Sequence, residues 1–219
     1  MTEQSGEPIG RLARRKQRTR AALIKAAQGF IAAGQLNVPI LDITQAADVG
    51  MGSFYNHFAT KDELFEAAVT DVLDTHGALL DRVTAPIDDP ADVFATSFRL
   101  TGRLFRRRPQ ESQILLARGP AVLFSERGLA PRARRDVARA VAAGRFDVDD
   151  PELTLAVAGG ALLGLGQLLR SEPGRDDAAD ADRVTRDVLR LFGMSAEEAH
   201  ALCQRPLPDL AAVEESGDP

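Results

Sequence analysis

The stretch ITQAADVGMGSFYNHF, from Ile43 to Phe58, restricts what this chain can fold into more than any other part of it. Apolar residues at helical spacing around Ile43 stop at residues 48–50 and start again at Phe54 and Phe58. Two short helices must therefore meet at a tight turn, which is the geometry of a helix-turn-helix. The second helix carries side chains that can bond to phosphates and base edges, and these are Ser53, Tyr55, Asn56 and His57.

The order of residues in this stretch resembles the DNA-binding segment of TetR-family transcriptional repressors. The shared pattern is apolar-x-x-Ala-Ala-x-Val-Gly-x-Gly-Ser-Phe-Tyr-x-His-Phe-x-x-Lys-x-x-Leu-Phe, and the match is dense over residues 40–65. Asp48 replaces the usual Gly of the turn, and Pro39 replaces the Thr or Ser that usually opens the first helix. Aspartate tolerates left-handed backbone better than most residues, so we expect the turn to survive. Asn37 or no side chain would then cap the first helix.

The resemblance implies that the second helix of the motif enters the major groove of DNA. Phe54 and Phe58 lie four residues apart and are expected to pack inward, which turns the polar side chains outward. Lys61 follows an expected helix cap at Thr60 and is well placed for a phosphate. The predicted DNA-binding residues are Arg15, Arg18, Thr44, Gly50, Gly52, Ser53, Tyr55, Asn56, His57 and Lys61.

Charge is distributed unevenly along the chain, whose net charge is -5 at pH 7. Residues 1–25 contain seven Lys and Arg against two Asp and Glu, whereas residues 66–219 contain 19 against 26. Positive charge therefore lies beside the helix-turn-helix and negative charge away from it, as expected for a protein that docks one end on DNA. A solvated tail is the alternative for the basic run, but phosphate attraction is preferred next to a reading helix.

The hydrophobic periodicity and the resemblance together predict an all-α protein with two helical domains. We expect helices over residues 13–33, 40–47 and 51–57, and then a long helix, ended by Pro86, that joins the two domains. The predicted organisation is a disordered tail over residues 1–10, a helix-turn-helix DNA-binding domain over 11–60, a helical ligand-binding and dimerisation domain over 61–204, and a disordered acidic tail over 205–219.

The candidate ligand site follows from a helix that starts at Asp89-Pro90 and carries phenylalanines on one broad side. Shorter segments after it can bend around a cavity, and the architecture of the TetR family places the ligand among these helices. Such a site suits a largely apolar or aromatic molecule with few polar contacts. The alternative is that the phenylalanines fill the core and that His76 is structural. The predicted ligand-binding residues are His76, Phe94, Phe98, Thr101, Phe105, Gln113, Leu116 and Phe124.

The most apolar stretch, LTLAVAGGALLGLGQLL, runs from Leu153 to Leu169. Its length is at the lower limit for a membrane span and it has no aromatic anchors, so a buried helix is preferred. Small residues recur every four positions and allow a symmetry mate to approach closely. The predicted homodimer interface, shared with a helix over 182–192, comprises Ala156, Gly160, Leu163, Gly164, Val184 and Val188.

A basic helix is expected over residues 128–146, with Arg132, Arg134, Arg135 and Arg139 on its outer face. A second nucleic-acid site is one interpretation, but acidic residues over 136–152 favour a solvated or ion-paired face. No catalytic constellation, metal-ligand pattern or phosphate loop is present in the sequence, so neither enzymatic activity nor a cofactor is predicted. The single cysteine, Cys203, and a polar N-terminus point to the cytoplasm.

The sequence thus predicts a ligand-responsive DNA-binding regulator, with repression as the expected mode. It would bind a palindromic double-stranded operator as a homodimer, away from any membrane, and a small, largely apolar effector would release it. One alternative is a helical ligand-binding or enzymatic protein whose helix-turn-helix is not used on DNA, and the charge segregation argues against it. Another is an architectural DNA-coating protein, which conflicts with the acidic bulk of the chain.

Overall fold

The computed structural model describes residues 10–210, and within this range the chain forms α-helices and one short 3-10 helix without any strand. The predicted all-α fold is therefore confirmed. The chain divides after Val69 into two compact units. Residues 1–9 of the predicted N-terminal tail and residues 211–219 of the predicted C-terminal tail lie outside the described residues.

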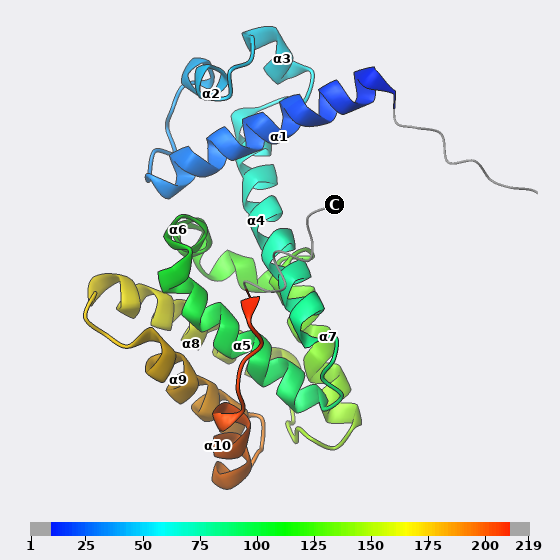
Figure 1. Ribbon diagram of the computed structural model, residues 1–219, viewed down its shortest axis with the longest axis vertical. Helices are drawn as coiled ribbons and strands as arrows, with labels where there is room; N and C mark the ends of the chain where they lie inside the picture. The colour runs from blue at the N-terminus through cyan, green and yellow to red at the C-terminus, as the bar shows by residue number, and fades with distance from the viewer. Residues whose placement is uncertain (1–9, 211–219) are drawn as a thin grey trace, which may run out of the picture. The chain divides into compact units, whose positions relative to one another are not determined.

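The first unit consists of α1 (Arg11–Ala32), α2 (Ile40–Ala46), α3 (Met51–Tyr55) and the start of α4 (Lys61–Thr84) (Figure 1). One apolar side of α1 packs behind the helix-turn-helix, and Gln28 Nε2 also donates to the carbonyl of Ala68 at 3.2 Å. The side chains enclosed between these helices include Leu23, Ile24, Ala27, Ile31, Ile43, Phe54, Phe58 and Leu64.

The turn between α2 and α3 depends on Asp48, whose φ of 53° is the only positive φ of a non-glycine residue in the described chain. The turn is closed by a hydrogen bond of 3.0 Å from Val49 N to Thr44 O. Asp48, which stands where the family usually has Gly, thus takes the left-handed conformation that the sequence predicted it would tolerate. The cost is about 1–2 kcal/mol relative to ordinary backbone. Pro39 precedes α2 and no side chain caps the helix, so Asn37 does not serve as its cap.

The second unit contains the rest of α4 together with α5 (Pro90–Arg107), α6 (Pro109–Arg118), η1 (Gly119–Phe124), α7 (Leu129–Ala142), α8 (Pro151–Ser171), α9 (Asp177–Leu191) and α10 (Ala196–Gln204). Helix α5 is its central element, since it contacts every helix from α6 to α10 and is buried along most of its length (Figure 1). Aspartates at 89, 150 and 176 cap α5, α8 and α9, and Ser195 with Glu198 forms a capping box at the start of α10.

The core of the second unit is built around three phenylalanine rings. The ring centroids of Phe146 and Phe192 lie 4.7 Å apart, and those of Phe94 and Phe192 lie 5.0 Å apart. Two arginines of α5, Arg99 and Arg103, are also almost enclosed, and both reach Asp182 of α9. The core therefore combines close aromatic packing with one buried charge cluster.

The predicted disorder of the C-terminal tail is wrong for residues 205–210. Arg205 forms an ion pair of 2.6 Å with Asp92, and its carbonyl accepts a hydrogen bond of 2.9 Å from Arg99 Nη1. Leu210 is buried with Leu80 and other leucines of α4 and α5. These contacts join residues more than a hundred positions apart, and the local Pro-rich, acidic composition gave no indication of them.

The arginines of α7 are largely ion-paired, as the sequence predicted. Arg132 and Arg135 both bond to Asp81 of α4, at 2.7 and 2.9 Å, and Arg134 reaches Glu152 at 3.3 Å. The acidic partners come from both the following segment and α4, which lies far away in the sequence. Since these charges are matched inside the second unit, they favour no separate nucleic-acid site.

Candidate DNA-binding surface and ligand cavity

Helix α3 turns its aromatic anchors inward and its polar groups outward. Phe54 and Phe58 are 0% and 2% exposed, as predicted, whereas Tyr55 is 60% exposed. Asn56 is exposed, and Ser53 and His57 are half-buried on the same short helix or directly after it. A Cβ placed on Gly50 or Gly52 would meet no atom within 4 Å, so the start of α3 is open to an approaching molecule. The polar groups of α3 and of the residues directly after it are therefore the candidate DNA-binding surface, beside the partly exposed Met51.

Thr44 does not belong to this surface. Its side chain is 1% exposed, and its hydroxyl donates to the carbonyl of Leu41 at 2.8 Å within α2. The sequence placed it among the DNA-binding residues, but the helix turns it toward the core beside Ile43. A buried hydroxyl that is already bonded has no access to a phosphate, so the structure does not support this assignment.

The basic side chains of α1 supply positive charge close to α3. Arg15 and Arg18 are exposed, and the guanidinium of Arg20 lies 5.1 Å from the centre of the Phe58 ring. The pKa of His57 is lowered by partial burial and by the nearby charges of Lys16 and Arg20. His57 is therefore neutral at pH 7 and can serve as a hydrogen-bonding group, while arginines and lysines provide the attraction to phosphate.

Lys61 begins α4 at the edge of the same surface. The helix start is capped by the Thr60 hydroxyl, which accepts from Glu63 N at 3.1 Å. The Lys61 ammonium donates to the carbonyl of Val38 at 3.2 Å, and this contact links α4 to the segment before α2. An ammonium has three donors, so two remain for a phosphate. Lys61 thus forms a hydrogen bond within the first unit and is also a candidate phosphate contact.

Two adjoining cavities, of about 100 and 80 Å³, lie within the second unit. They share wall residues from α5, α7 and α8. An apolar cavity of about 150 Å³ stays dry and can bind benzene, so the combined space is suited to a single aromatic ring. The shared wall residues are Phe94, Phe98, Thr101, Leu129, Ala133 and Leu162.

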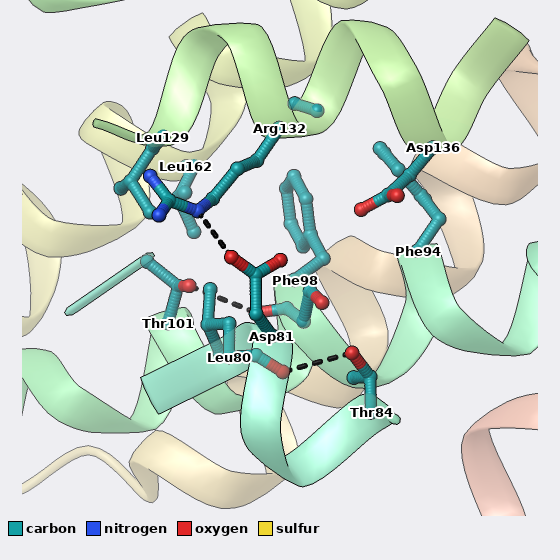
Figure 2. A pocket seen from close by; sticks show the side chains of 12 residues that line it. Leu80, Asp81, Thr84, Phe94, Phe98, Thr101, Leu129, Arg132, Asp136 and Leu162 are labelled. Atoms are coloured by element: carbon teal, nitrogen blue, oxygen red, sulfur yellow. Dashed lines mark hydrogen bonds and ion pairs between the residues drawn. The ribbon is translucent and has the colours of Figure 1, made fainter. Parts of the chain in front are cut away.

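The smaller cavity has a charged edge. Figure 2 shows Arg132 of α7 extending toward Asp81 of α4, and its Nε donates to Asp81 Oδ2 at 2.7 Å. Asp136 lines the same cavity and accepts from Arg135 Nε at 2.8 Å. Burial raises the pKa of Asp81, but hydrogen bonds from Arg132 and Arg135 outweigh it and lower the pKa below its usual value. This edge therefore presents charged acceptors, and the guanidinium donors of Arg132, to a polar substituent at pH 7.

A buried hydrogen bond lies on the other side of the aromatic wall. His76 is 3% exposed, and its Nε2 lies 3.0 Å from Thr101 Oγ1. Burial, with smaller contributions from Arg108 and Arg132, lowers the pKa of His76 to about 4, so the imidazole is neutral at pH 7. These side chains border a third cavity of about 10 Å³, which is room for about one water molecule.

Four of the predicted ligand residues, Phe94, Phe98, Thr101 and Phe105, line the larger cavity, and His76 lines the third. Three others do not line any of the cavities described above. Phe124 is 66% exposed, Leu116 packs beside Phe105 and Leu165, and Gln113 is half-buried elsewhere on α6. Helix η1 contributes Val122 and Leu123 to the wall of the larger cavity, because it turns Phe124 outward.

Sequence reasoning missed the contributions of α7 and α8 to the cavities. Arg132 was assigned to a solvated or ion-paired outer face and not to a cavity, although Leu129, Arg132, Ala133 and Asp136 follow the spacing of a single helical stripe. On α8, Leu163 was assigned to the dimer interface but lines the larger cavity. The other residues of α8 in that wall are Leu155, Ala158, Gly159 and Leu162.

The opposite face of α8 is exposed and apolar. Leu153 and Val157 are 63% and 51% exposed, and Gly160 and Gly164 continue the same stripe with no atom within 4 Å of an added Cβ. By length and composition α8 could cross a membrane. Within this chain only the inner side of α8 is covered, and the sequence predicts that a symmetry mate covers the outer side. Of the other predicted interface residues, Ala156 and Val184 are half-buried and Val188 packs into the core at 4% exposure.

Comparison with protein-family models gives two matches along the chain. Residues 23–68 match the model of bacterial regulatory proteins of the tetR family, and residues 89–205 match the model of the tetracyclin repressor-like C-terminal domain. A curated relative, the HTH-type transcriptional repressor KstR2 of Mycolicibacterium smegmatis, is 31% identical over 77 residues. That match covers 33% of this chain and 38% of the relative, so this chain spans little more than a third of the relative's length.

Two crystal structures of RolR are similar over nearly the whole chain. The structure without ligand is 34% identical, covers 87% of this chain and 98% of RolR, and has a TM-score of 0.73. The complex of RolR with resorcinol is 32% identical, covers 90% of this chain and 99% of RolR, and has a TM-score of 0.64. The likeness therefore includes both compact units.

Proposed function

The chain belongs to the TetR family of bacterial regulatory proteins, and we propose that it is a cytoplasmic repressor that binds a palindromic operator as a homodimer and is released by a small aromatic effector. The observation that carries the proposal is that α3 and the residues directly after it bury Phe54 and Phe58 and present Tyr55 and Asn56 to solvent. A helix anchored by buried aromatic side chains can enter a major groove while those side chains stay packed in the core.

The contacts with DNA divide into two kinds. The polar side chains of Ser53 and Tyr55 on α3, and of Asn56 directly after it, can approach base edges because Gly50 and Gly52 leave the helix start open. Arginines of α1 and Lys61 of α4 lie around α3 and would attract phosphates whatever the sequence. Affinity would then come mainly from the basic residues, and choice of operator from α3.

Replacing Lys61 with alanine tests the DNA-binding proposal. The wild-type protein is expected to shift DNA from upstream of its own coding region in an electrophoretic assay. Lys61→Ala should weaken binding to this DNA and to unrelated DNA by a similar factor, and should reduce the slope of log K against log salt by about 1. Arg139→Ala removes the same charge from an exposed position on α7 and should leave the slope unchanged. Equal slopes for wild type and Lys61→Ala would contradict the phosphate contact.

The exposed stripe of α8 is the proposed dimer interface. Leucine and valine side chains on this stripe remain uncovered in a single chain, which favours burial against a second copy. The two glycines in the middle allow the backbones of two helices to approach closely. Two-fold symmetry would place the two helix-turn-helix domains of the dimer on half-sites about one helical turn of DNA apart.

Gly160→Leu should weaken this dimer, because the new side chain would fill the space left for the partner helix. Within one chain no atom lies within 4 Å of a Cβ at this position, so the fold itself should tolerate the change. The expected cost to dimerisation is about 1–3 kcal/mol, measurable by sedimentation equilibrium. Gly29→Leu, at an equally open position on α1, should leave the dimer intact. A monomeric wild type, or an undisturbed Gly160→Leu dimer, would exclude this interface.

The effector is proposed to be a small phenol such as resorcinol, the ligand of RolR. The paired cavities have room for about one aromatic ring, with apolar walls and a charged edge formed by Asp81 and Arg132. Helix α4 provides Asp81 and His76 to the cavities and begins at Lys61. A ligand that displaces this one helix would therefore change the spacing of the two helix-turn-helix domains of the dimer and release the operator.

A further inference from the structure

Thr101 occupies an unusual position among the cavity residues. It is 4% exposed and borders the larger, the smaller and the third cavity. Within the described part of the chain it is the one polar side chain in the wall of the larger cavity, which otherwise consists of Phe, Leu, Val, Ala and Gly. A ligand that fills this space therefore meets the Thr101 hydroxyl as its polar contact there.

The hydrogen-bond partners of Thr101 determine what its hydroxyl can do. Oγ1 donates its single hydrogen to the carbonyl of Ser97 at 2.8 Å. His76 Nε2 lies 3.0 Å from the same oxygen, and because that hydrogen is already used, the imidazole must be the donor in this pair. A hydroxyl oxygen has two lone pairs, and His76 occupies one. The second lone pair remains, so Thr101 offers the cavity an acceptor and no donor.

His76 is suited to hold this arrangement without changing charge. It is 3% exposed, and burial lowers its pKa to about 4, with Arg108 and Arg132 adding to the effect. Burial, with a smaller contribution from these two charges, therefore keeps the ring neutral at pH 7. A neutral imidazole that donates through Nε2 prevents Thr101 from turning its own hydrogen toward the ligand.

We propose that Thr101 selects effectors by accepting a hydrogen bond from a ring hydroxyl, and that His76 is the positioning residue that restricts Thr101 to this accepting role. This inference rests on the proposed function, since it concerns the same effector cavity. The charged edge differs from Thr101, because it contains both acceptors, in Asp81 and Asp136, and the Arg132 guanidinium, which uses N–H groups on Asp81 and Gly128 O and has others that can donate. A ring with two hydroxyl groups can donate to Thr101 and bond at the charged edge as well. An ether oxygen beside Thr101 has no donor to meet.

The test compares resorcinol with 1,3-dimethoxybenzene, in which both hydroxyl groups are ethers, so no orientation of the ring brings a donor to Thr101. Isothermal titration of the wild-type protein should show binding of resorcinol about 10-fold tighter, since a buried acceptor left without a partner costs about that factor. Thr101→Val keeps the side-chain shape and should lower this ratio several-fold, because the acceptor at position 101 is gone. Thr101→Ser retains the hydroxyl and should preserve the preference.

Two variants of His76 test its positioning role. His76→Leu frees the Thr101 hydroxyl to rotate and donate, so the preference for resorcinol should fall although Thr101 itself is present. His76→Gln keeps an N–H donor and should restore the preference, which a merely structural role of the imidazole would not predict. Thermal unfolding of each variant monitors the fold.

The outcomes separate this inference from the proposed function. If wild type binds both compounds with equal affinity, or if Thr101→Val and Thr101→Ser show the same ratio, Thr101 is not the selecting residue, while the effector class stands. If wild type binds neither compound at millimolar concentration, the phenol proposal fails together with the inference. The comparison of two ligands on wild type needs no variant and remains decisive if a substitution prevents folding.

Discussion

Phe192→Ala is expected to lower the free energy of unfolding of the second unit by about 3–5 kcal/mol, the range observed for removal of a fully buried phenylalanine. Phe192 is 0% exposed and lies against the rings of Phe94 and Phe146 at 5.0 and 4.7 Å. Its removal would leave a void surrounded by helices α5 and α9 and the segment after α7, which cannot all move inward. Urea unfolding followed by circular dichroism measures the loss.

Phe124→Ala is the matched control for this change. Phe124 is 66% exposed on η1, so the same truncation should alter stability by less than about 0.5 kcal/mol. Similar losses for the two variants would mean that the aromatic cluster does not hold the second unit together.

Asp182→Ala should be nearly as damaging, at about 3 kcal/mol, because it leaves two guanidinium groups without their partner. Arg99 Nε and Arg103 Nη1 approach Asp182 Oδ1 at 2.7 and 2.8 Å, and the two arginines are 4% and 8% exposed. An uncompensated buried charge costs more than the ion pair itself contributes, so the loss should exceed that of an exposed pair. Asp187→Ala, which removes an exposed carboxylate from the same helix, is the control.

The cluster of Asp182 with Arg99 and Arg103 also makes the stability of the protein depend on pH. Burial raises the pKa of Asp182, but hydrogen bonds from Arg103 and Arg99 outweigh it and place the pKa below its ordinary value. A carboxylate with a lowered folded pKa stabilises the protein above its unfolded pKa of about 3.9 and loses this contribution as pH falls toward the folded value. Urea midpoints should therefore fall below about pH 4 in wild type, and less steeply in Asp182→Ala. Parallel pH curves would show that Asp182 is not coupled to the arginines.

The structure of the helix-turn-helix domain could be largely predicted from the sequence, because the residues that determine it are close together in the chain. The spacing of Phe54 and Phe58 decided which side of α3 faces inward, and the left-handed turn followed from Asp48. Thr44 escaped prediction because α2 is only seven residues long, too short for the periodicity to separate its buried face from its exposed one.

The second unit was harder to predict because its features depend on residues distant in sequence. The charged edge of the cavity exists only because α4 brings Asp81 beside Arg132, 51 residues later in the chain. The order of residues 205–210 likewise depends on Asp92 and Arg99 of α5, which composition alone does not reveal. Helical periodicity could locate α5, yet it could not show which of its phenylalanines fill the core and which border empty space.

The adjacent glycines 159 and 160 face different sides of α8. A Cβ on Gly159 would stand 2.4 Å from Leu123 Cδ2 in the cavity wall, whereas one on Gly160 would meet nothing within the chain. If the outer stripe holds a second copy, one turn of helix is under two independent selective pressures, from the effector inside and from the partner outside. New effector preferences should then arise more readily through substitutions in α5 and α7 than in α8, and divergence among descendants of this regulator should be slowest along these two glycines.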